Sequence, residues 1–429
     1  MILFYILVAI SPMPNHPLFE APFAGLTVVK WLGIICCGYA IYRLFSRPRV
    51  PAFFRSWEIR SFLVLLVLAT ASYLTLSKTG NLTFNPMFMY FNYLPLFFTT
   101  MCVVDTYERL RNTLFAAIAG ELLTSLYVIR EFQASGGTIL RPGYIAGDAN
   151  YFATCLLLVL PVTAYFVKIK GSPWTRRFCA GSVLVMLVAF TLASSRGGLV
   201  GLCAVIFYMV LCSGQARRGA IAIAILLLPM LLFAPASPLQ RMLHPDYGDY
   251  VGAEVRREFW REGLHMIANH PLTGIGLGNF TAEAISEVAG EFKGIACNTF
   301  LEVAAELGIP GFLAYCAVVT GALVSAGKLR RRGMRTGDIR LQYIGQAMQA
   351  GLLGFAAAAV FVSAEYQKPF WIMTALTATI PTLLRDIRSE ASKRQQASDV
   401  SVPQPSSTQL YFDDADWAPL ASSTARVSD

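Results

Sequence analysis

Charged side chains are scarce in this sequence: Asp, Glu, Lys and Arg make up 14% of its 429 residues, while hydrophobic residues make up 55%. An ordinary soluble domain is about 25% charged. A chain this apolar cannot cover a globule with polar surface, which excludes a soluble enzyme, a disordered scaffold and a nucleic-acid-binding protein. The net charge of +9 therefore needs an explanation other than nucleic acid.

Clusters of metal ligands are also missing. The chain has four histidines, and its nine cysteines show no CxxC pairing or other metal-ligand spacing. All of the cysteines but one lie within apolar runs, where they behave as small hydrophobic residues. The exception, Cys297, is expected at the outer edge of such a run. The sequence thus predicts no metal site and no cofactor.

Long apolar runs are what the sequence has instead. A helix needs about 20 apolar residues to cross a bilayer, and about twelve candidate runs follow one another along the chain. The sequence therefore predicts an all-α, polytopic integral membrane helix bundle with about twelve transmembrane helices and one long outer loop at 237–297. The predicted spans lie near residues 1–14, 23–44, 61–77, 87–104, 112–130, 149–167, 178–195, 198–213, 220–236, 298–326, 343–364 and 369–384.

The basic residues indicate how these spans are oriented. Short loops rich in Lys and Arg stay in the cytoplasm. With the N-terminus inside, most of the 35 Lys and Arg residues fall in the inside loops, so the charge is mainly a topology signal and both termini are predicted to be cytoplasmic. The segment 386–429 is rich in Ser, Gln, Ala and Pro, and we expect a disordered tail there.

Arg196 is the first candidate for chemistry. It stands in the segment Ser-Ser-Arg-Gly-Gly between two predicted spans that almost lack a connecting loop. A charge at such a place is costly unless it faces a polar cavity or a partner. Two interpretations remain open: the side chain extends to the lipid headgroups, or its planar guanidinium binds phosphate oxygens.

Residues 253–269 are predicted to form an amphipathic helix on the outer face of the membrane, because their apolar side chains recur at helical spacing. Trp260 suits the membrane interface, and Arg256 lies one turn before it on the same face. Arg257 and Arg261 form a neighbouring stripe. These arginines either meet anionic headgroups or form a second phosphate clamp.

His270 begins a glycine-rich segment, His-Pro-Leu-Thr-Gly-Ile-Gly-Leu-Gly-Asn-Phe, that ends at Phe280. A dinucleotide-binding fingerprint would require a preceding strand and a βαβ unit, which this sequence does not predict. We expect a tight loop that folds back towards the membrane. His270 is expected to mark the end of helix 253–269, and a catalytic role for it is the less favoured alternative.

Carboxylates enter the next predicted span from its outer end. Glu302 and Glu306 lie one turn apart on one helix face and need partners. Pairing with one of the arginines above would either fix a phosphate clamp or be purely structural. The segment Gly308-Ile309-Pro310-Gly311 is expected to kink or interrupt this helix. Glu121 is a further carboxylate, deep in a predicted span and without an assignable partner.

Together these segments resemble the superfamily of O-antigen ligases and O-antigen polymerases, which are bacterial envelope glycosyltransferases. Its members are multi-span proteins with a long periplasmic loop in the second half and a Ser-Arg-Gly at the head of a span. Here Ser195-Arg196-Gly197, Arg256 before Trp260, and residues 270–280 match in order, and residues 147–161 resemble the start of an earlier span. The resemblance covers roughly residues 145–385.

The ligase branch of this superfamily carries a His followed by Asn, Ser or Gln and, farther on, by a Gly-x-x-Gly segment. Asn298 and Gly308–Gly311 keep that spacing here, but Cys297 stands in place of the His. The His is thought to activate the acceptor hydroxyl. Glu302 or His270 would then serve as the base, or the acceptor needs little activation. A polymerase-like or otherwise divergent branch is the alternative that we narrowly favour.

The resemblance implies glycan transfer at the periplasmic face of the bacterial inner membrane. The donor would be a polyprenyl-diphosphate-linked glycan, the acceptor a hydroxyl on a lipid, a glycan or a protein, and no metal or cofactor would take part. The implied catalytic residues are Arg196, Arg256, Cys297 and Glu302, and the implied substrate-binding residues are Arg257, Arg261, Asn298 and His270.

Two other functions remain open on the sequence. A flippase or transporter of polysaccharide or lipid-linked oligosaccharide would also carry charges in its spans, but it would be expected to show internal repeats. A protein O-oligosaccharyltransferase would share the motifs. In each case the expected regions are N-terminal spans at 1–144, the ligase-like region at 145–385 with its periplasmic loop, and the cytoplasmic tail at 386–429.

Overall fold

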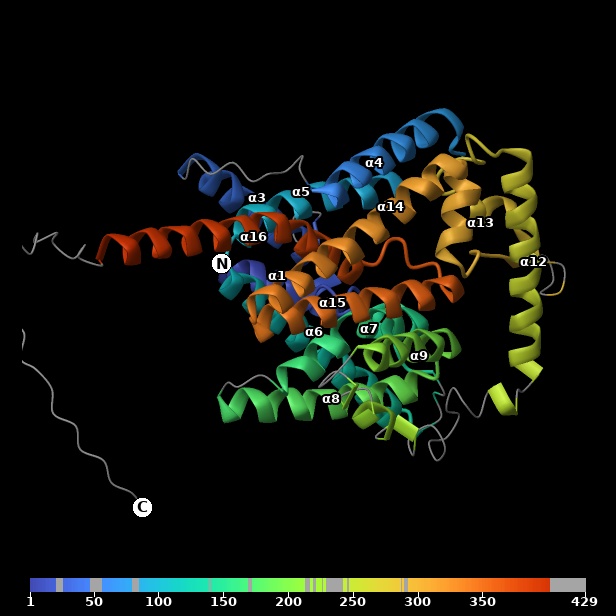
Figure 1. Cartoon of the computed structure of the whole chain (residues 1–429). Coiled ribbons are helices and arrows are strands. Elements are labelled where there is room, and N and C mark those ends of the chain that lie inside the picture. The colour runs from blue at the N-terminus through green and yellow to red at the C-terminus, as the bar shows by residue number, and fades with distance from the viewer. Residues whose placement is uncertain are drawn as a thin grey trace, which may run out of the picture. The chain divides into compact units, whose positions relative to one another are not determined.

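The structure is a computed structural model of the chain, shown in Figure 1. Contacts within the chain divide it into two units, Met1–Arg385 and Asp386–Asp429. The structure describes residues 1–20, 26–46, 56–78, 85–137, 139, 141–168, 172–212, 217–218, 221–225, 227–228, 242–244, 247–286, 288 and 292–401.

Helices make up nearly all of the described secondary structure. The N-terminal half contains α1 (Ile2–Ile10), α2 (Pro17–Glu20), α3 (Val28–Ser46), α4 (Trp57–Leu76), α5 (Pro86–Val103), α6 (Tyr107–Ala134), the short η2 (Tyr144–Ala146), α7 (Ala149–Phe166), α8 (Pro173–Ala193) and α9 (Arg196–Leu211). The C-terminal half contains α12 (Tyr247–Asn269), α13 (Phe280–Glu283), α14 (Thr299–Thr336), α15 (Ile339–Ala358), η3 (Ala359–Phe361) and α16 (Lys368–Ser401). Strands β1 (Ile285–Ser286) and β2 (Phe292–Lys293) form one antiparallel pair.

Seven of the described helical segments are long and apolar enough to cross a membrane: α3, α4, α6, α7, α8, α14, and α15 continued through η3. They confirm the prediction of an all-α, multi-pass membrane protein. α9 is apolar but shorter, and α1 has nine residues. The predicted span at 220–236 lies mostly outside the described residues.

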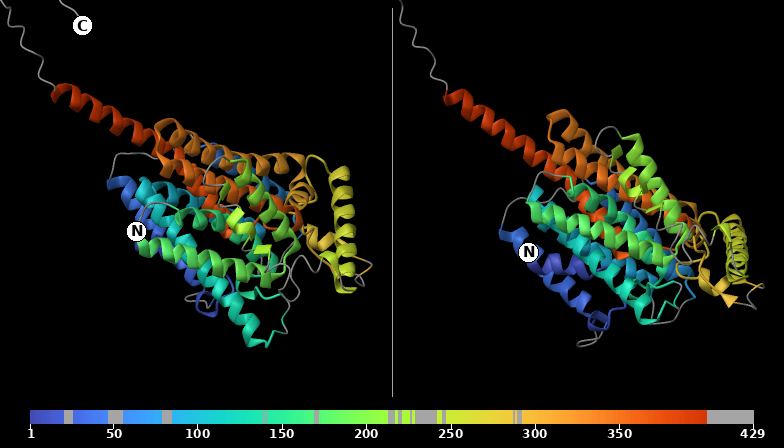
Figure 2. Two further views of the ribbon diagram at one scale, coloured as in Figure 1. Left: turned by 60° about the horizontal axis from the view of Figure 1, so that its bottom comes forward. Right: turned by 90° about the horizontal axis from the view of Figure 1, so that it is seen from below.

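The helix α7 lies within the bundle, with α8, α9 and α15 packed against it (Figures 1 and 2). Glycines allow these helices to approach closely. A side chain at Gly201 would collide with the carbonyl oxygen of Gly354 on α15, and one at Gly351 would collide with that of Leu158 on α7. The N-terminal half of α9, which begins with Arg196, is therefore held tightly against the bundle.

Trp371 on α16 joins this helix to the N-terminal helices. Its ring is fully buried, stacks on Tyr93 at 4.9 Å between ring centroids, and meets Phe62 edge-on at 5.1 Å. Its indole N–H donates to the carbonyl of Glu365 at 2.8 Å. One aromatic side chain thus fixes α16 to α4 and α5 and also orders the loop before α16.

The helix α12 runs across the ends of the bundle helices rather than alongside them (Figure 1). It confirms the helix predicted at 253–269 and begins earlier, at Tyr247. At the other end of the chain, α16 runs from Lys368 to Ser401. Residues 402–429 lie outside the described residues.

Glu121 is buried in the middle of α6 with 1% of its surface exposed. Neither carboxylate oxygen has a hydrogen-bond partner among the described residues. The side chain borders a cavity of about 20 Å³ that is also lined by Val8, Ser11 and Pro12 at the end of α1, which is room for about one water molecule. A buried polar group without protein partners destabilises the fold.

We expect the substitution Glu121→Met to raise the unfolding temperature of the protein in detergent. Replacing an unsatisfied buried group with an apolar one of similar size removes a desolvation cost of about 1–3 kcal/mol. Glu302→Met is the matched control and should lower that temperature, because Glu302 accepts hydrogen bonds from Ala296 and Ser363. An equal loss in both variants would contradict this interpretation of Glu121.

Candidate active site

The helix α14 is interrupted at Gly308, whose backbone is not helical (φ 69°, ψ −176°). Pro310 has no N–H to give to the carbonyl of Glu306, four residues earlier. The N–H groups of Ile275 and Gly276 bond instead to the carbonyls of Ala305 and Glu306, at 2.9 and 3.1 Å. The predicted interruption is confirmed, and the loop after α12 supplies the backbone donors that the break requires.

The glycine-rich segment 270–280 therefore docks on α14, and we call it the docking loop. Gly274 and Gly276 have φ values of +66° and +108°, a region that glycine adopts without steric cost. A side chain at Gly274 would collide with the carbonyl of Glu306. The Glu306 carboxylate accepts a hydrogen bond from the N–H of Phe280 at 3.2 Å. The expected tight glycine loop is present, and its glycines serve close backbone packing.

Asn279 ties the same loop to the end of α4. It is fully buried. Its amide nitrogen donates to the carbonyls of Leu76 and Ile275 at 3.0 and 2.8 Å, and its amide oxygen accepts from the N–H of Lys78 at 2.9 Å. The loop is thus held by two elements that are far apart in the sequence, α4 and α14.

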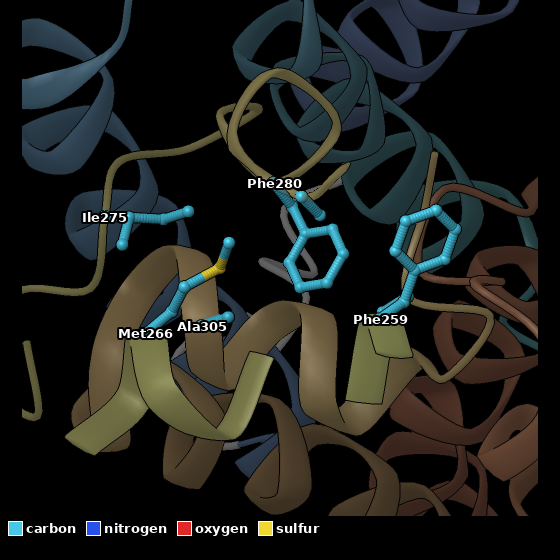
Figure 3. Close-up of a cluster of buried hydrophobic side chains, with 7 residues drawn as sticks. Phe259, Met266, Ile275, Phe280 and Ala305 are labelled. Atoms are coloured by element: carbon cyan, nitrogen blue, oxygen red, sulfur yellow. The ribbon is translucent and has the colours of Figure 1, made fainter. Parts of the chain in front are cut away.

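A hydrophobic cluster fastens α12 to this loop (Figure 3). Phe259 and Met266 from α12 pack with Ile275 and Phe280 from the loop and with Ala305 from α14. All five are at most 9% exposed, and burying an apolar side chain of this size contributes about 1.5–3 kcal/mol. The position of α12 across the bundle ends is therefore fixed by packing.

Two hydrogen-bonded turns position Arg196 at the start of α9. The hydroxyl of Ser195 caps α9 by accepting from the N–H of Gly198 at 3.1 Å, and it donates to the side-chain oxygen of Asn150 at 2.9 Å. Asn150 stands in the first turn of α7, where Asp148 is the N-cap and accepts from its N–H at 2.7 Å. The segments containing Asn150 and Arg196, separate in the sequence, meet at one end of the bundle.

A cavity of about 440 Å³ opens between these elements. Arg196 lines one part of it and Arg256 another, from α9 and α12 respectively. Asp249 also lines the cavity and pairs with Arg196 at 3.5 Å. The side chains of four lining residues are basic and one is acidic, so the lining has a net positive charge. The described residues that line the cavity are Arg141, Arg196, Asp249, Gly252, Val255, Arg256, Phe259, Thr281, Lys293, Gly294, Ile295 and Cys297.

Cys297 and Arg256 both line the cavity. Burial raises the pKa of the Cys297 thiol, and the positive charge of Arg256 partly opposes that rise. The backbone of Cys297 is left-handed, with φ of 49°. A non-glycine residue in that region is strained, and such strain clusters at functional sites.

The residues on either side of the cysteine hold it in place. The N–H of Ala296 donates to the carboxylate of Glu302 at 3.1 Å, and its carbonyl accepts from the indole N–H of Trp260 at 2.9 Å. Asn298 caps α14 by accepting from the N–H groups of its first turn. The hydroxyl of Ser363 also donates to Glu302. Glu302 and Asn298 therefore fix the backbone that presents the thiol.

The structure places the eight predicted site residues in three groups. Arg196, Arg256 and Cys297 line the cavity, while Glu302 and Asn298 lie behind it. The third group faces away: Arg257 and Arg261 have side chains 73% and 68% exposed and pair with Glu254 and Glu262, and His270 is exposed at the end of α12.

The predicted pairing between carboxylates and arginines takes another form. Glu302 and Glu306 accept hydrogen bonds from backbone N–H groups, and Glu302 also from Ser363. The carboxylate that pairs with Arg196 is that of Asp249, which sequence reasoning missed. Both glutamates are buried beside backbone N–H groups that need acceptors. The sequence alone does not show where such N–H groups lie.

Arg141 and Lys293 were also missed. Both are exposed residues that line the cavity. The sequence carried a signal for both residues, because each falls in a predicted outer segment. Short basic loops are expected to stay in the cytoplasm, so this rule does not explain a basic residue there. Asp249 had a signal of its own: it lies two helical turns before Arg256, and thus on the same face of α12.

Fold and cavity together define a multi-pass membrane protein with a basic cavity at one end of its helix bundle. The model of the O-Antigen ligase family matches residues 181–316, and this range holds Arg196, Arg256 and Cys297. An O-antigen ligase of Pseudomonas aeruginosa is 25% identical over 283 residues, which are 63% of this chain. The aligned part spans 66% of that curated relative's length. This match over residues 181–316 confirms the resemblance to the O-antigen ligase family seen in the sequence.

We expect Asn279→Ala to loosen the docking loop. The substitution removes three hydrogen bonds made by a fully buried side chain, each contributing about 1 kcal/mol. Limited proteolysis within residues 270–286 should become faster and the unfolding temperature should fall. Thr281→Ala, in the short helix α13 that follows the loop, is the control, and equal protease resistance of all three proteins would contradict the role of Asn279.

Alkylation of Cys297 tests its contact with Arg256. In a variant that keeps Cys297 as its single cysteine, the alkylation rate should rise with pH as the thiol ionises. Arg256→Gln removes the charge that lowers the pKa, so the midpoint of the rate-against-pH curve should move to higher pH. Arg257→Gln should leave the midpoint unchanged. Identical midpoints in all three would show that Arg256 does not act on the thiol.

Proposed function

We propose that the protein is a glycosyltransferase that transfers a glycan from a polyprenyl-diphosphate carrier to a hydroxyl acceptor. The observation that carries this proposal is the presence of Arg196 and Arg256, from two different helices, in the lining of one basic cavity. A diphosphate is a good leaving group once its negative charge is held. Guanidinium groups hold phosphate oxygens through paired hydrogen bonds, and charge that develops in the transition state is stabilised by donors already in position.

The remaining predicted residues take supporting roles in this proposal. Glu302 and Asn298 hold the backbone of Cys297, which stands where the ligase branch has its His. Arg257 and Arg261 lie on the exposed face of α12, where they would meet anionic lipid headgroups or glycans instead of the diphosphate. His270, exposed at the end of the helix, would contact substrate only outside the cavity. None of these positions identifies the group that accepts the proton of the acceptor hydroxyl.

The proposal includes a membrane topology. About twelve spans place both termini in the cytoplasm and residues 237–297, with α12 and the cavity, in the periplasm of the bacterial inner membrane. The distribution of Lys and Arg supports this arrangement. The acceptor and the carrier would then meet at the periplasmic face.

The envelope glycans of cells lacking the protein separate the candidate reactions. Single repeat units accumulating on the lipid carrier would indicate a polymerase. Long chains accumulating on the carrier and absent from their final acceptor would indicate a ligase. Repeat units trapped on the cytoplasmic side would indicate a flippase and would contradict the proposed clamp.

Substitution of the two cavity arginines tests the clamp directly. We expect Arg196→Ala and Arg256→Ala each to lower transfer by about 100-fold or more, with the protein still inserted in the membrane at its normal level. Arg257→Ala and Arg261→Ala are the matched controls on α12 and should retain most of the activity. Normal transfer in the Arg196→Ala, Arg256→Ala double variant would overturn diphosphate binding in this cavity.

A further inference from the structure

Transfer to a hydroxyl group releases a proton, and the cavity must provide a group to accept it. Cys297 is a poor candidate, because burial raises the pKa of its thiol and a neutral thiol accepts no proton. The other candidates from the sequence lie elsewhere. Glu302 is committed to Ala296 and Ser363 behind the cavity, and His270 is exposed at the far end of α12.

Asp249 is the one carboxylate among the described residues that line the cavity. The residue is 3% exposed and its side chain 1%. It stands in the first turn of α12, and Gly252, Arg256 and Phe259 follow it on the cavity-lining face. Asp249 and Arg256 are two turns apart, about 10 Å along the helix axis.

The carboxylate of Asp249 would be unfavourable in a cavity whose only role is to bind a diphosphate. A carboxylate 3.5 Å from Arg196 weakens the attraction of that arginine for phosphate. Residues that break a local physical rule are expected mainly at functional or strained sites. The contact with Arg196 also holds the carboxylate at the cavity wall.

We propose that Asp249 is the catalytic base of this cavity, an inference that rests on the proposed glycosyl transfer. The carboxylate takes the proton from the acceptor hydroxyl while that oxygen forms a bond to the anomeric carbon of the donor sugar. The bond from this carbon to the diphosphate oxygen breaks, and its electron pair leaves with the diphosphate. Arg196 and Arg256 hold the new charge. The products are the glycoside, the polyprenyl diphosphate and a protonated Asp249, which returns its proton to water.

The test uses the full-length protein, purified in detergent, with a polyprenyl-diphosphate-linked glycan extracted from cells that lack the protein. Asp249→Asn keeps the shape and polarity of the side chain but accepts no proton. We expect its turnover to fall by about 100-fold or more and its binding of the donor to be unchanged or tighter, because a negative charge next to the diphosphate is gone. Asp249→Glu should recover part of the turnover.

Two further readouts separate a base from a residue that merely orients Arg196. The wild-type rate should fall as pH decreases and the carboxylate becomes protonated, and Asp249→Asn should lose this dependence. Added formate should restore turnover to Asp249→Ala, in which space is open for a small carboxylate. Thermal unfolding in detergent checks that each variant is folded.

Several results would overturn the proposal. Wild-type turnover in Asp249→Asn would exclude a base at this position. Weaker donor binding with unchanged turnover would show that Asp249 only positions Arg196. If Asp249→Asn turns over normally while Arg196→Ala does not, the base is wrong and the proposed transfer stands. If the wild-type protein transfers nothing from the extracted donor, the proposed function fails and the base fails with it.

Discussion

The interruption of α14 at Gly308 and Pro310 is the constraint on which the rest of the site depends. A break in a buried helix leaves carbonyl groups that must find donors. The loop after α12 provides them through the N–H groups of Ile275 and Gly276, and Ile309 donates in return to the carbonyl of Pro271. The geometry of a membrane helix thus determines where a segment outside the bundle can dock.

The helix α12 is held at its C-terminal end, along its length and at its N-terminal turn. Its C-terminal end runs into the loop, its middle packs through Phe259 and Met266, and its N-terminal turn contacts the bundle through the pair of Asp249 and Arg196. The first two attachments are backbone hydrogen bonds and apolar packing, and only the third is ionic. Arg256, between the apolar and ionic attachments, is therefore carried into the cavity by interactions in which it takes no part.

The sequence was most informative where one residue type has one physical use. Gly308 and Pro310 predicted the break, hydropathy predicted the bundle, and the position of Arg196 between two spans predicted a charge that needs a polar site. Helix 253–269 was also predictable. The sequence did not show which of its three arginines lines a cavity, because neighbouring stripes of one helix are distinguished only by the residues that they contact. Arg256 enters the cavity and Arg257 points away, and this difference is set by the loop and by α14.

Asp249 and Lys293 show the limit in another way. Their place in the sequence marked them as charges without an evident partner, but the contacts that bring them into one cavity join segments distant in sequence. Glu306 is the reverse case: a buried carboxylate that invited a functional interpretation accepts a hydrogen bond from the backbone of the docking loop. Residue type and spacing predicted that these groups need partners, and the identity of each partner came from the tertiary structure.

The left-handed backbone at residue 297 determines which side chains this position accepts without strain. His, Asn and Asp adopt that region several times more often than most other residues, so the backbone conformation at this position is easier for the family's His than for the Cys that occupies it. The main chain at residue 297 therefore gives no preference for a thiol over an imidazole. A functional difference between Cys and His at this position therefore lies in the chemistry of the side chain, and the backbone at residue 297 would accept an imidazole with less strain than the thiol that it carries.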